Sequence, residues 1–301
     1  MPDFTAKDVQ ALREKTGVGM MDCKKALTEA GGDMEKATEL LREKGLAAAA
    51  KKAGRIAAEG LVKCVTDGDV SVVLEVNSET DFVSKNKDFS AFVDAVGMTV
   101  AKQNPADLDA LLKLTLDGSG DTVEAALQEK ILVIGENLKI RRFERHVGAA
   151  ATYIHGEGKI GVMVAFETDV ADKCGFAEMG RDVAMQIAAI TPQYVGRDDV
   201  PADVVAKEKE ILTAQAMNEG KPQNIAEKMV QGRINKFYKD VCLLEQAFVK
   251  DGDITVGQYV ENVAKELGGS VKVKCFTRFE RGEGLEKRVD DFAGEIASMM
   301  K

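Results

Sequence analysis

The sequence predicts an α+β protein with a small helical N-terminal module and a duplicated core that contains antiparallel sheets. Three observations lead to this class. Hydrophobic residues make up 45% of the 301 residues, which is ordinary for a globular chain. The hydrophobic pattern changes from helical to alternating near residue 60. The hairpin-and-helix pattern that follows recurs after residue 150. The length allows about two domains.

Residues 1–55 are expected to form three short helices and a linker. Thr5 is a candidate N-cap because an acidic residue follows three positions later, and Gly17 is expected to end this first helix. Gly45 is expected to close the third helix. The Ala-rich, basic stretch 47–58 is then interpreted as a helical linker to the core.

Residues 56–145 are expected to form the first core unit. Apolar residues over 61–65 and 70–76, separated by an Asp-Gly turn, are typical of a β-hairpin. Two helices are expected to follow, over 89–100 and 122–134, because apolar residues recur there at helical spacing.

A second core unit is expected over two stretches, 146–190 and 240–280, which flank an insertion. The first stretch contains another apparent hairpin, formed by 150–155 and 160–166. A helix follows whose apolar residues have the same mutual spacing as those of the first unit. The second stretch contains a further helix and ends in a strand over 271–279. Both units carry Glu-Thr-Asp between hairpin and helix, which favours a duplication.

The insertion and the end of the chain are expected to be helical. Residues 191–239 show two helical patterns without strands, which predicts a helical hairpin that projects from the core. Residues 281–301 are expected to end in an amphipathic helix, because one stripe carries Val289, Phe292, Ile296 and Met299.

Composition excludes several classes of function. The chain has 41 Lys and Arg against 50 Asp and Glu, a net charge of −9, so we expect no direct contact with nucleic acid. No stretch approaches the roughly 18 apolar residues that span a bilayer, and no signal peptide is recognised, so no membrane partner is expected. The 5 cysteines include no C-x-x-C pair, which is typical of reduced thiols and predicts a cytoplasmic protein. Only 2 histidines make a zinc site improbable.

The stretch from Gly156 to Gly161 matches the G-x-G-x-x-G pattern of dinucleotide-binding loops. Such a loop must follow a strand and open a helix, whereas here a strand pattern follows the glycines. We therefore interpret the stretch as a hairpin turn and expect no cofactor. A phosphate-binding P-loop sequence is also missing from the chain.

Thr80, Asp81, Phe82 and Val83 form the most informative stretch. In one interpretation Phe82 and Val83 pack under the following helix while Asp81 caps it. In the other, an exposed aromatic side chain beside a carboxylate forms a binding hot spot on a rigid loop. The residues alone leave both interpretations open.

Three other residues invite a functional interpretation. Met20 and Met21 lie in a glycine-rich turn, and methionine suits both a core and an adaptable binding surface. His155 lies at the end of a predicted strand without an obvious nucleophilic partner, which favours a surface histidine. An enzyme using the Asp81 and His155 regions as an acid–base pair would require these loops to converge on a pocket.

Two stretches, TGVGMMDCKKAL at 16–27 and NSETDFV at 77–83, closely resemble the bacterial elongation factor Ts family. The resemblance covers essentially the whole chain. It implies a translation elongation factor and guanine-nucleotide exchange factor that binds the GTPase elongation factor Tu in its GDP state. The factor would disturb the Mg²⁺ and nucleotide site, promote GDP release and allow GTP to bind. It implies no covalent chemistry, and hence no catalytic residue, metal or cofactor on this chain.

The resemblance also assigns segments and residues. Residues 1–55 would be similar to ubiquitin-associated three-helix domains, and 191–239 to a coiled-coil or dimerisation segment, which leaves a homodimer open. A binding scaffold without exchange activity is the alternative. The residues assigned to partner binding are the Mg²⁺-dislocating loop Thr80, Asp81, Phe82 and Val83, together with Leu12, Met20, Met21 and His155.

Overall fold

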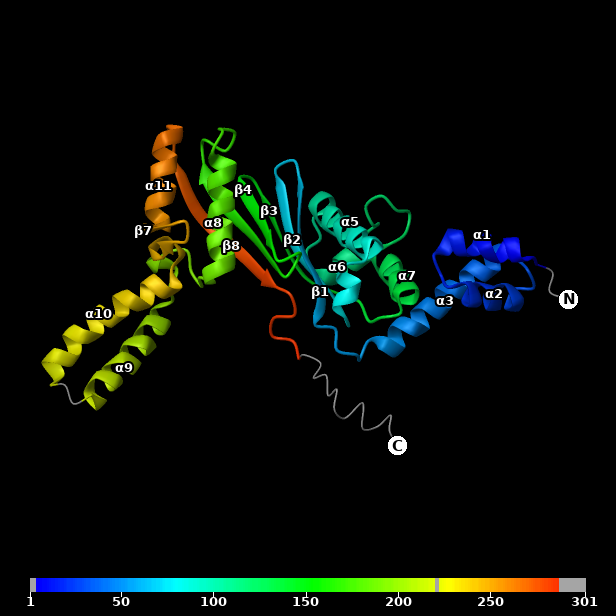
Figure 1. Cartoon of the computed structure of the whole chain (residues 1–301), viewed down its shortest axis with the longest axis horizontal. Coiled ribbons are helices and arrows are strands. Elements are labelled where there is room, and N and C mark those ends of the chain that lie inside the picture. Colours follow the sequence, from blue (N-terminus) through cyan, green and yellow to red (C-terminus); the bar gives the residue numbers. More distant parts are fainter. Residues whose placement is uncertain (1–3, 220–221, 287–301) are drawn as a thin grey trace.

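The computed structural model describes residues 4–219 and 222–286, and it confirms the predicted α+β class with antiparallel sheets. Figure 1 shows the N-terminal helices at one end, two sheets in the middle and a helical arm at the other end. The predicted terminal helix lies outside the described residues. None of the helices within the described ranges is long and apolar enough to cross a membrane.

The N-terminal module consists of α1 (Ala6–Thr16), α2 (Met20–Glu29) and α3 (Met34–Lys52). Thr5 and Asp8 form the expected capping box, and Gly17 ends α1 with a φ of 67°. The prediction that Gly45 closes the third helix is wrong, because α3 continues to Lys52. A mid-helix glycine costs about 1 kcal/mol relative to alanine, but here it lies against α7 (Val123–Ile134), where packing offsets that cost.

The first core unit is a three-stranded antiparallel sheet in the order β1-β2-β3, with helices on one face. Its third strand was not predicted, because its sequence KIRRFERHV has more charged than apolar residues. The strand ends at Val147, two residues beyond the expected domain boundary at 145/146. The elements are β1 (Glu59–Asp67), β2 (Val70–Ser78), α4 (Asp81–Ser84), α5 (Lys87–Gln103), α6 (Leu108–Lys113), α7 and β3 (Lys139–Val147).

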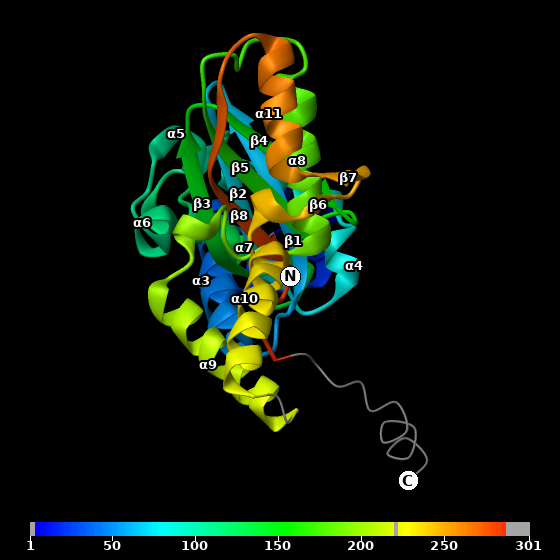
Figure 2. The same ribbon diagram turned by 90° about the vertical axis from the view of Figure 1, so that its left-hand side faces the viewer.

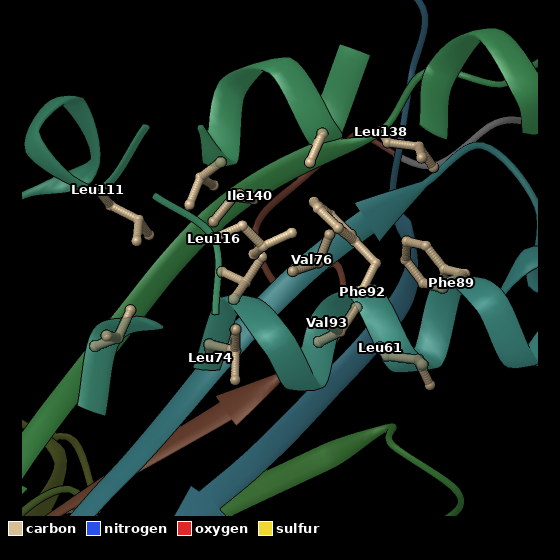
Figure 3. Close-up of a cluster of buried hydrophobic side chains, with 14 of the residues drawn as sticks. Leu61, Leu74, Val76, Phe89, Phe92, Val93, Leu111, Leu116, Leu138 and Ile140 are labelled. Carbon is tan, nitrogen blue, oxygen red and sulfur yellow. The ribbon is translucent and has the colours of Figure 1, made fainter. Parts of the chain in front are cut away.

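The core of this unit lies between the sheet and α5. Figure 3 shows Phe92 of α5 beside Val76 of β2, and Phe89, Phe92, Leu74 and Val76 are all buried in one cluster. Burying side chains of this size stabilises a fold by about 1.5–3 kcal/mol each. The helix that follows the Thr80–Val83 loop is therefore firmly attached to the sheet.

The second core unit repeats this plan with the strand order β4-β5-β8. Two helices, α8 and α11, lie over the outer face of its sheet (Figure 2). The elements are β4 (Ala150–His155), β5 (Ile160–Thr168), α8 (Phe176–Ile190), a 3₁₀ turn (Arg197–Asp199), the hairpin helices α9 (Ala202–Asn218) and α10 (Gln223–Val241), a second 3₁₀ turn (Leu243–Glu245), β6 (Ala247–Phe248), β7 (Asp251–Thr255), α11 (Val256–Leu267) and β8 (Val271–Glu280).

The two sheets pack face to face through their helix-free sides. Val62 and Val73 of the first sheet contact Met163 and Phe279 of the second. The expected hairpin turn at 156–161 is confirmed, since its residues join β4 to β5. The backbone N–H of Val62 donates to the carbonyl oxygen of Gly158 in this turn at 2.9 Å. Gly158 and Gly161 thus allow the two sheets to pack closely, because a side chain at either position would overlap β1.

We expect Gly161→Ala to destabilise the fold by about 1–3 kcal/mol, the usual cost of overpacking a core. A Cβ atom at this position would overlap the Val62 side chain and lie 3.3 Å from Val73 Cγ2. Gly232→Ala is the matched control, because that glycine lies within α10 with open space around it. The control should stabilise by up to about 1 kcal/mol. Urea unfolding measures both, and equal effects would contradict this view of the sheet interface.

Candidate functional site

Thr80 is the N-cap of the one-turn helix α4, which is separated from β2 by two residues and carries Asp81, Phe82 and Val83. The two apolar side chains of this stretch point to different environments. Phe82 is 78% exposed, whereas Val83 is 5% exposed and belongs to the core of the first unit. Asp81 is exposed and lies 3.9 Å from the Lys85 ammonium. The interpretation that Asp81 caps the long helix is wrong, because Asn86 caps α5. The structure therefore presents Phe82 outward beside a carboxylate.

Glu136, which follows the C-terminal end of α7, is hydrogen-bonded to this loop. One carboxylate oxygen accepts hydrogen bonds from the backbone N–H groups of Glu79, at 3.1 Å, and Thr80, at 3.0 Å. The other accepts from the Thr80 hydroxyl at 2.6 Å. Hydrogen bonds to a charged acceptor are stronger than neutral ones. The backbone immediately before Phe82 is thus anchored to the segment that follows α7.

A second set of contacts binds the same loop to the N-terminal linker. The Glu79 carboxylate accepts from the Asn137 backbone N–H at 2.6 Å and from the Arg55 guanidinium at 3.3 Å. The Asn137 amide donates in turn to the Arg55 carbonyl oxygen at 2.8 Å. Nearby, the Lys52 ammonium donates to the Ile131 carbonyl oxygen at 3.3 Å, and burial lowers the pKa of this lysine.

The equivalent loop of the second unit is closed, in the sense that the side chain at the position of Phe82 is buried. Val170 occupies the position of Phe82 in the repeated motif and is only 2% exposed. The Asp169 carboxylate accepts from the backbone N–H of Ser270 at 2.7 Å, and this hydrogen bond lowers the pKa of Asp169. A Cβ atom on Gly269 would overlap the Val170 side chain, which shows how tightly the loop packs. The duplicated sequence therefore presents an aromatic side chain in the first unit alone.

The methionine turn is also exposed. Met20 is 52% exposed and Met21 64% exposed, so both side chains are available to a partner. Leu12 differs, because it is fully buried among the helices of the N-terminal module. The assignment of Leu12 to partner binding stays a prediction, and in the free chain its side chain does not reach the surface. Its side chain stabilises the module that presents the methionines.

The methionine turn and the Phe82 loop are linked through the end of α7. A Cβ atom on Gly17 would lie 3.7 Å from Val133 Cγ2, so the glycine turn packs against α7. Helix α7 ends at Ile134, with Gly135 as its C-cap, and Glu136 follows at once. One short segment therefore contacts both predicted partner-binding regions.

His155 lies exposed at the end of β4, and its Nδ1 atom is 3.0 Å from the Tyr153 hydroxyl. Two cavities, of about 540 and 770 Å³, are described, and neither is lined by His155 or Asp81. Within residues 4–219 and 222–286 no group of three His, Cys, Asp or Glu side chains could hold a metal ion. The exposed Phe82 and Asp81 side chains on the Thr80–Val83 loop are suited to contact with another macromolecule.

Sequence reasoning found the loop but missed its anchors, Glu136, Asn137 and Arg55. Glu136 lies 56 positions from Thr80, and no motif or period relates the two. The repeated Glu-Thr-Asp sequence pointed to Glu79 alone. Its hydrogen-bond partners depend on how α7 is placed on the sheet.

Comparisons with known proteins agree on one family. The family model described as "Elongation factor TS" matches residues 79–283, more than half of the chain. Elongation factor Ts of Syntrophotalea carbinolica is 53% identical over 301 residues, covering 99% of both chains. Elongation factor Ts of Clostridioides difficile is 55% identical over 306 residues, covering 100% of both. Elongation factor Ts of Trichlorobacter lovleyi is 51% identical, with 98% of each chain covered.

Proposed function

The chain belongs to the elongation factor Ts family of translation elongation factors, and on this premise we propose that it is the guanine-nucleotide exchange factor of elongation factor Tu. It would bind the GDP form of that GTPase, promote GDP release and leave when GTP refills the site. We propose that it does so in the cytoplasm, without direct contact with nucleic acid. It would need no covalent chemistry, cofactor or metal of its own.

The thermodynamic basis of this function is linkage between two binding equilibria. A factor that binds the nucleotide-free partner more tightly than the nucleotide-bound partner must weaken nucleotide binding by the same factor. Mg²⁺ neutralises phosphate charge, so displacing its ligands removes a large part of the nucleotide affinity. A rigid group that enters the partner near the Mg²⁺ site is therefore sufficient to weaken nucleotide binding.

The observation that carries the proposal is the exposed Phe82 side chain on its anchored loop. Aromatic residues dominate binding hot spots because they bury a large area at low entropic cost. Phe82 is 78% exposed and can bury its ring in a partner, and the adjacent, exposed Asp81 can place a carboxylate beside it. The closed second loop lacks this property, so the wedge role belongs to the first unit.

We further propose that Met20 and Met21 contact the GTPase domain, and that His155 contacts the partner from the second unit. Replacing both methionines with alanine should weaken complex formation about tenfold or more, since interface hot-spot residues contribute 1 kcal/mol or more each. Because both side chains are more than half exposed, the unfolding temperature should stay unchanged. Calorimetric titration with nucleotide-free elongation factor Tu measures the affinity, and an unaltered value would remove the methionines from the contact.

Release of a fluorescent GDP analogue from elongation factor Tu tests the function directly. The purified chain should accelerate release in proportion to its concentration until the partner is saturated. A scaffold without exchange activity would bind the partner and leave the release rate unchanged. An enzyme using the Asp81 and His155 regions would require a shared pocket, and neither described cavity supplies one.

A homodimer through the helical hairpin stays a prediction. The described parts of α9 and α10 expose Ile211, Met217 and Ile225, which are apolar side chains that a second copy could cover. Sedimentation of the free chain would determine whether it does.

A further inference from the structure

We infer that Glu136 is a positioning residue for exchange: its carboxylate holds the Thr80 backbone so that Phe82 projects into the partner. This inference rests on the proposed function and extends it to a residue outside the contact surface. Nothing in the motif or the family resemblance indicates Glu136.

Helix α4 spans only Asp81–Ser84, a single turn of 4 residues. Forming a first helical turn is unfavourable because several backbone dihedrals are ordered for one hydrogen bond. Its N-cap residue, Thr80, makes no side-chain capping hydrogen bond to the turn. The turn that presents Phe82 must therefore be stabilised from outside.

Glu136 supplies the stabilising contacts at the N-terminal side of the turn. Its two carboxylate oxygens accept three hydrogen bonds, at 3.1, 3.0 and 2.6 Å, from two consecutive residues just before Asp81. An acceptor that engages two backbone N–H groups and a hydroxyl restrains both position and orientation. Val83 anchors the other side of the turn in the core. Phe82 lies between these two anchors and can project without collapsing onto the surface.

The contrast with the second unit supports this assignment. There the motif's own carboxylate, on Asp169, accepts from the backbone N–H of Ser270, and the side chain at the Phe82 position is buried. In the first unit Glu136, from another segment, accepts the hydrogen bonds that hold the loop, so the Asp81 carboxylate does not have to. The external carboxylate thus leaves both Asp81 and Phe82 available to a partner.

The test is a double-mutant cycle on the maximal rate of GDP release at saturating factor. Glu136→Ala should lower this rate about tenfold, the effect of losing hydrogen bonds to a charged group. The concentration for half-maximal effect should stay close to wild type, since Met20 and Met21 are untouched. In the Phe82→Ala background the same substitution should add less than about twofold, because residues that act through one another are not additive. Glu136→Gln, which keeps one acceptor oxygen, should recover part of the rate.

The matched control is Glu124→Ala, which removes an exposed carboxylate from the other end of α7 and should leave the rate unchanged. Equal slowing by Glu136→Ala in both backgrounds, or no slowing in either, would overturn the inference. The GDP-release rate of the Phe82→Ala variant alone tests the proposed function separately. If Phe82→Ala exchanges at the wild-type rate, the proposed wedge fails, whatever Glu136 does.

Discussion

GDP release from elongation factor Tu at saturating factor should slow about thirtyfold when Phe82 is replaced by alanine, because a central aromatic hot spot contributes 2 kcal/mol or more. The side chain is 78% exposed and makes little contribution to the core, so the variant should unfold at the wild-type temperature. Stopped-flow fluorescence with a labelled GDP measures the rate.

Val249→Ala is the control for this substitution. Val249 is 45% exposed and follows β6 in the second unit, so the variant loses a comparable exposed apolar group elsewhere. Its release rate should match wild type. A wild-type rate in the Phe82 variant would show that the ring is not the wedge, and Asp81 or the loop backbone would then have to displace Mg²⁺.

The largest effect on stability is expected at Glu75, a fully buried residue of β2 that lies opposite Arg142 of β3. Its carboxylate lies 3.0 Å from the Arg141 guanidinium and 2.7 Å from that of Arg142, and it accepts from the Gly282 backbone N–H at 2.7 Å. Gly282 follows β8, so this one carboxylate joins the first sheet to the end of the second. Glu75→Gln should lower the free energy of unfolding by about 3 kcal/mol at neutral pH, because it removes the buried, charged partner that Arg141 and Arg142 share.

The pH dependence of this effect has a defined sign. Burial acts to raise the pKa of Glu75, but the Gly282 N–H, the Asn77 amide and the Arg142 guanidinium together hold the pKa below its ordinary value of 4.5. A lowered folded-state pKa stabilises the fold above pH 4.5, and this stabilisation is lost as the pH falls through the folded value. The difference between wild type and Glu75→Gln should therefore shrink on acidification.

Chemical unfolding at neutral pH and below pH 4 measures this difference. Glu261→Gln is the control, because Glu261 and Lys265 form an ion pair in which both side chains are exposed, and exposed pairs contribute at most about 1 kcal/mol. A destabilisation of Glu75→Gln that stays constant with pH would show that packing, and not charge, accounts for the loss.

Most of the secondary structure follows from local sequence. The sequence predicts the two hairpins and the helices α5, α7, α8 and α11, because their apolar residues recur at the spacing of a strand or of a helix. The strand β3 was missed for the opposite reason. Its charged side chains are paired by tertiary contacts such as those of Arg141 and Arg142 with Glu75, and the alternation that marks a strand is masked.

The candidate site divides in the same way. The helical period already placed Leu12 on one face with Val9, and both are buried, as that pattern predicts. For Phe82 the residues left burial and exposure open. Only the position of α7, which brings Glu136 to the loop, shows that the ring projects while Val83 is buried.

The sequence by itself therefore determined the α+β class, the duplicated units and the stretch that carries Phe82, because periodicity, turn residues and a long motif are properties of neighbouring positions. The tertiary structure alone decided that one copy of the Glu-Thr-Asp loop is open and the other closed. That difference depends on which distant group reaches the loop. In the first unit it is a carboxylate 56 positions away, and in the second it is the Ser270 backbone, 101 positions from Asp169. Contacts over such separations are made by packing and leave no local pattern.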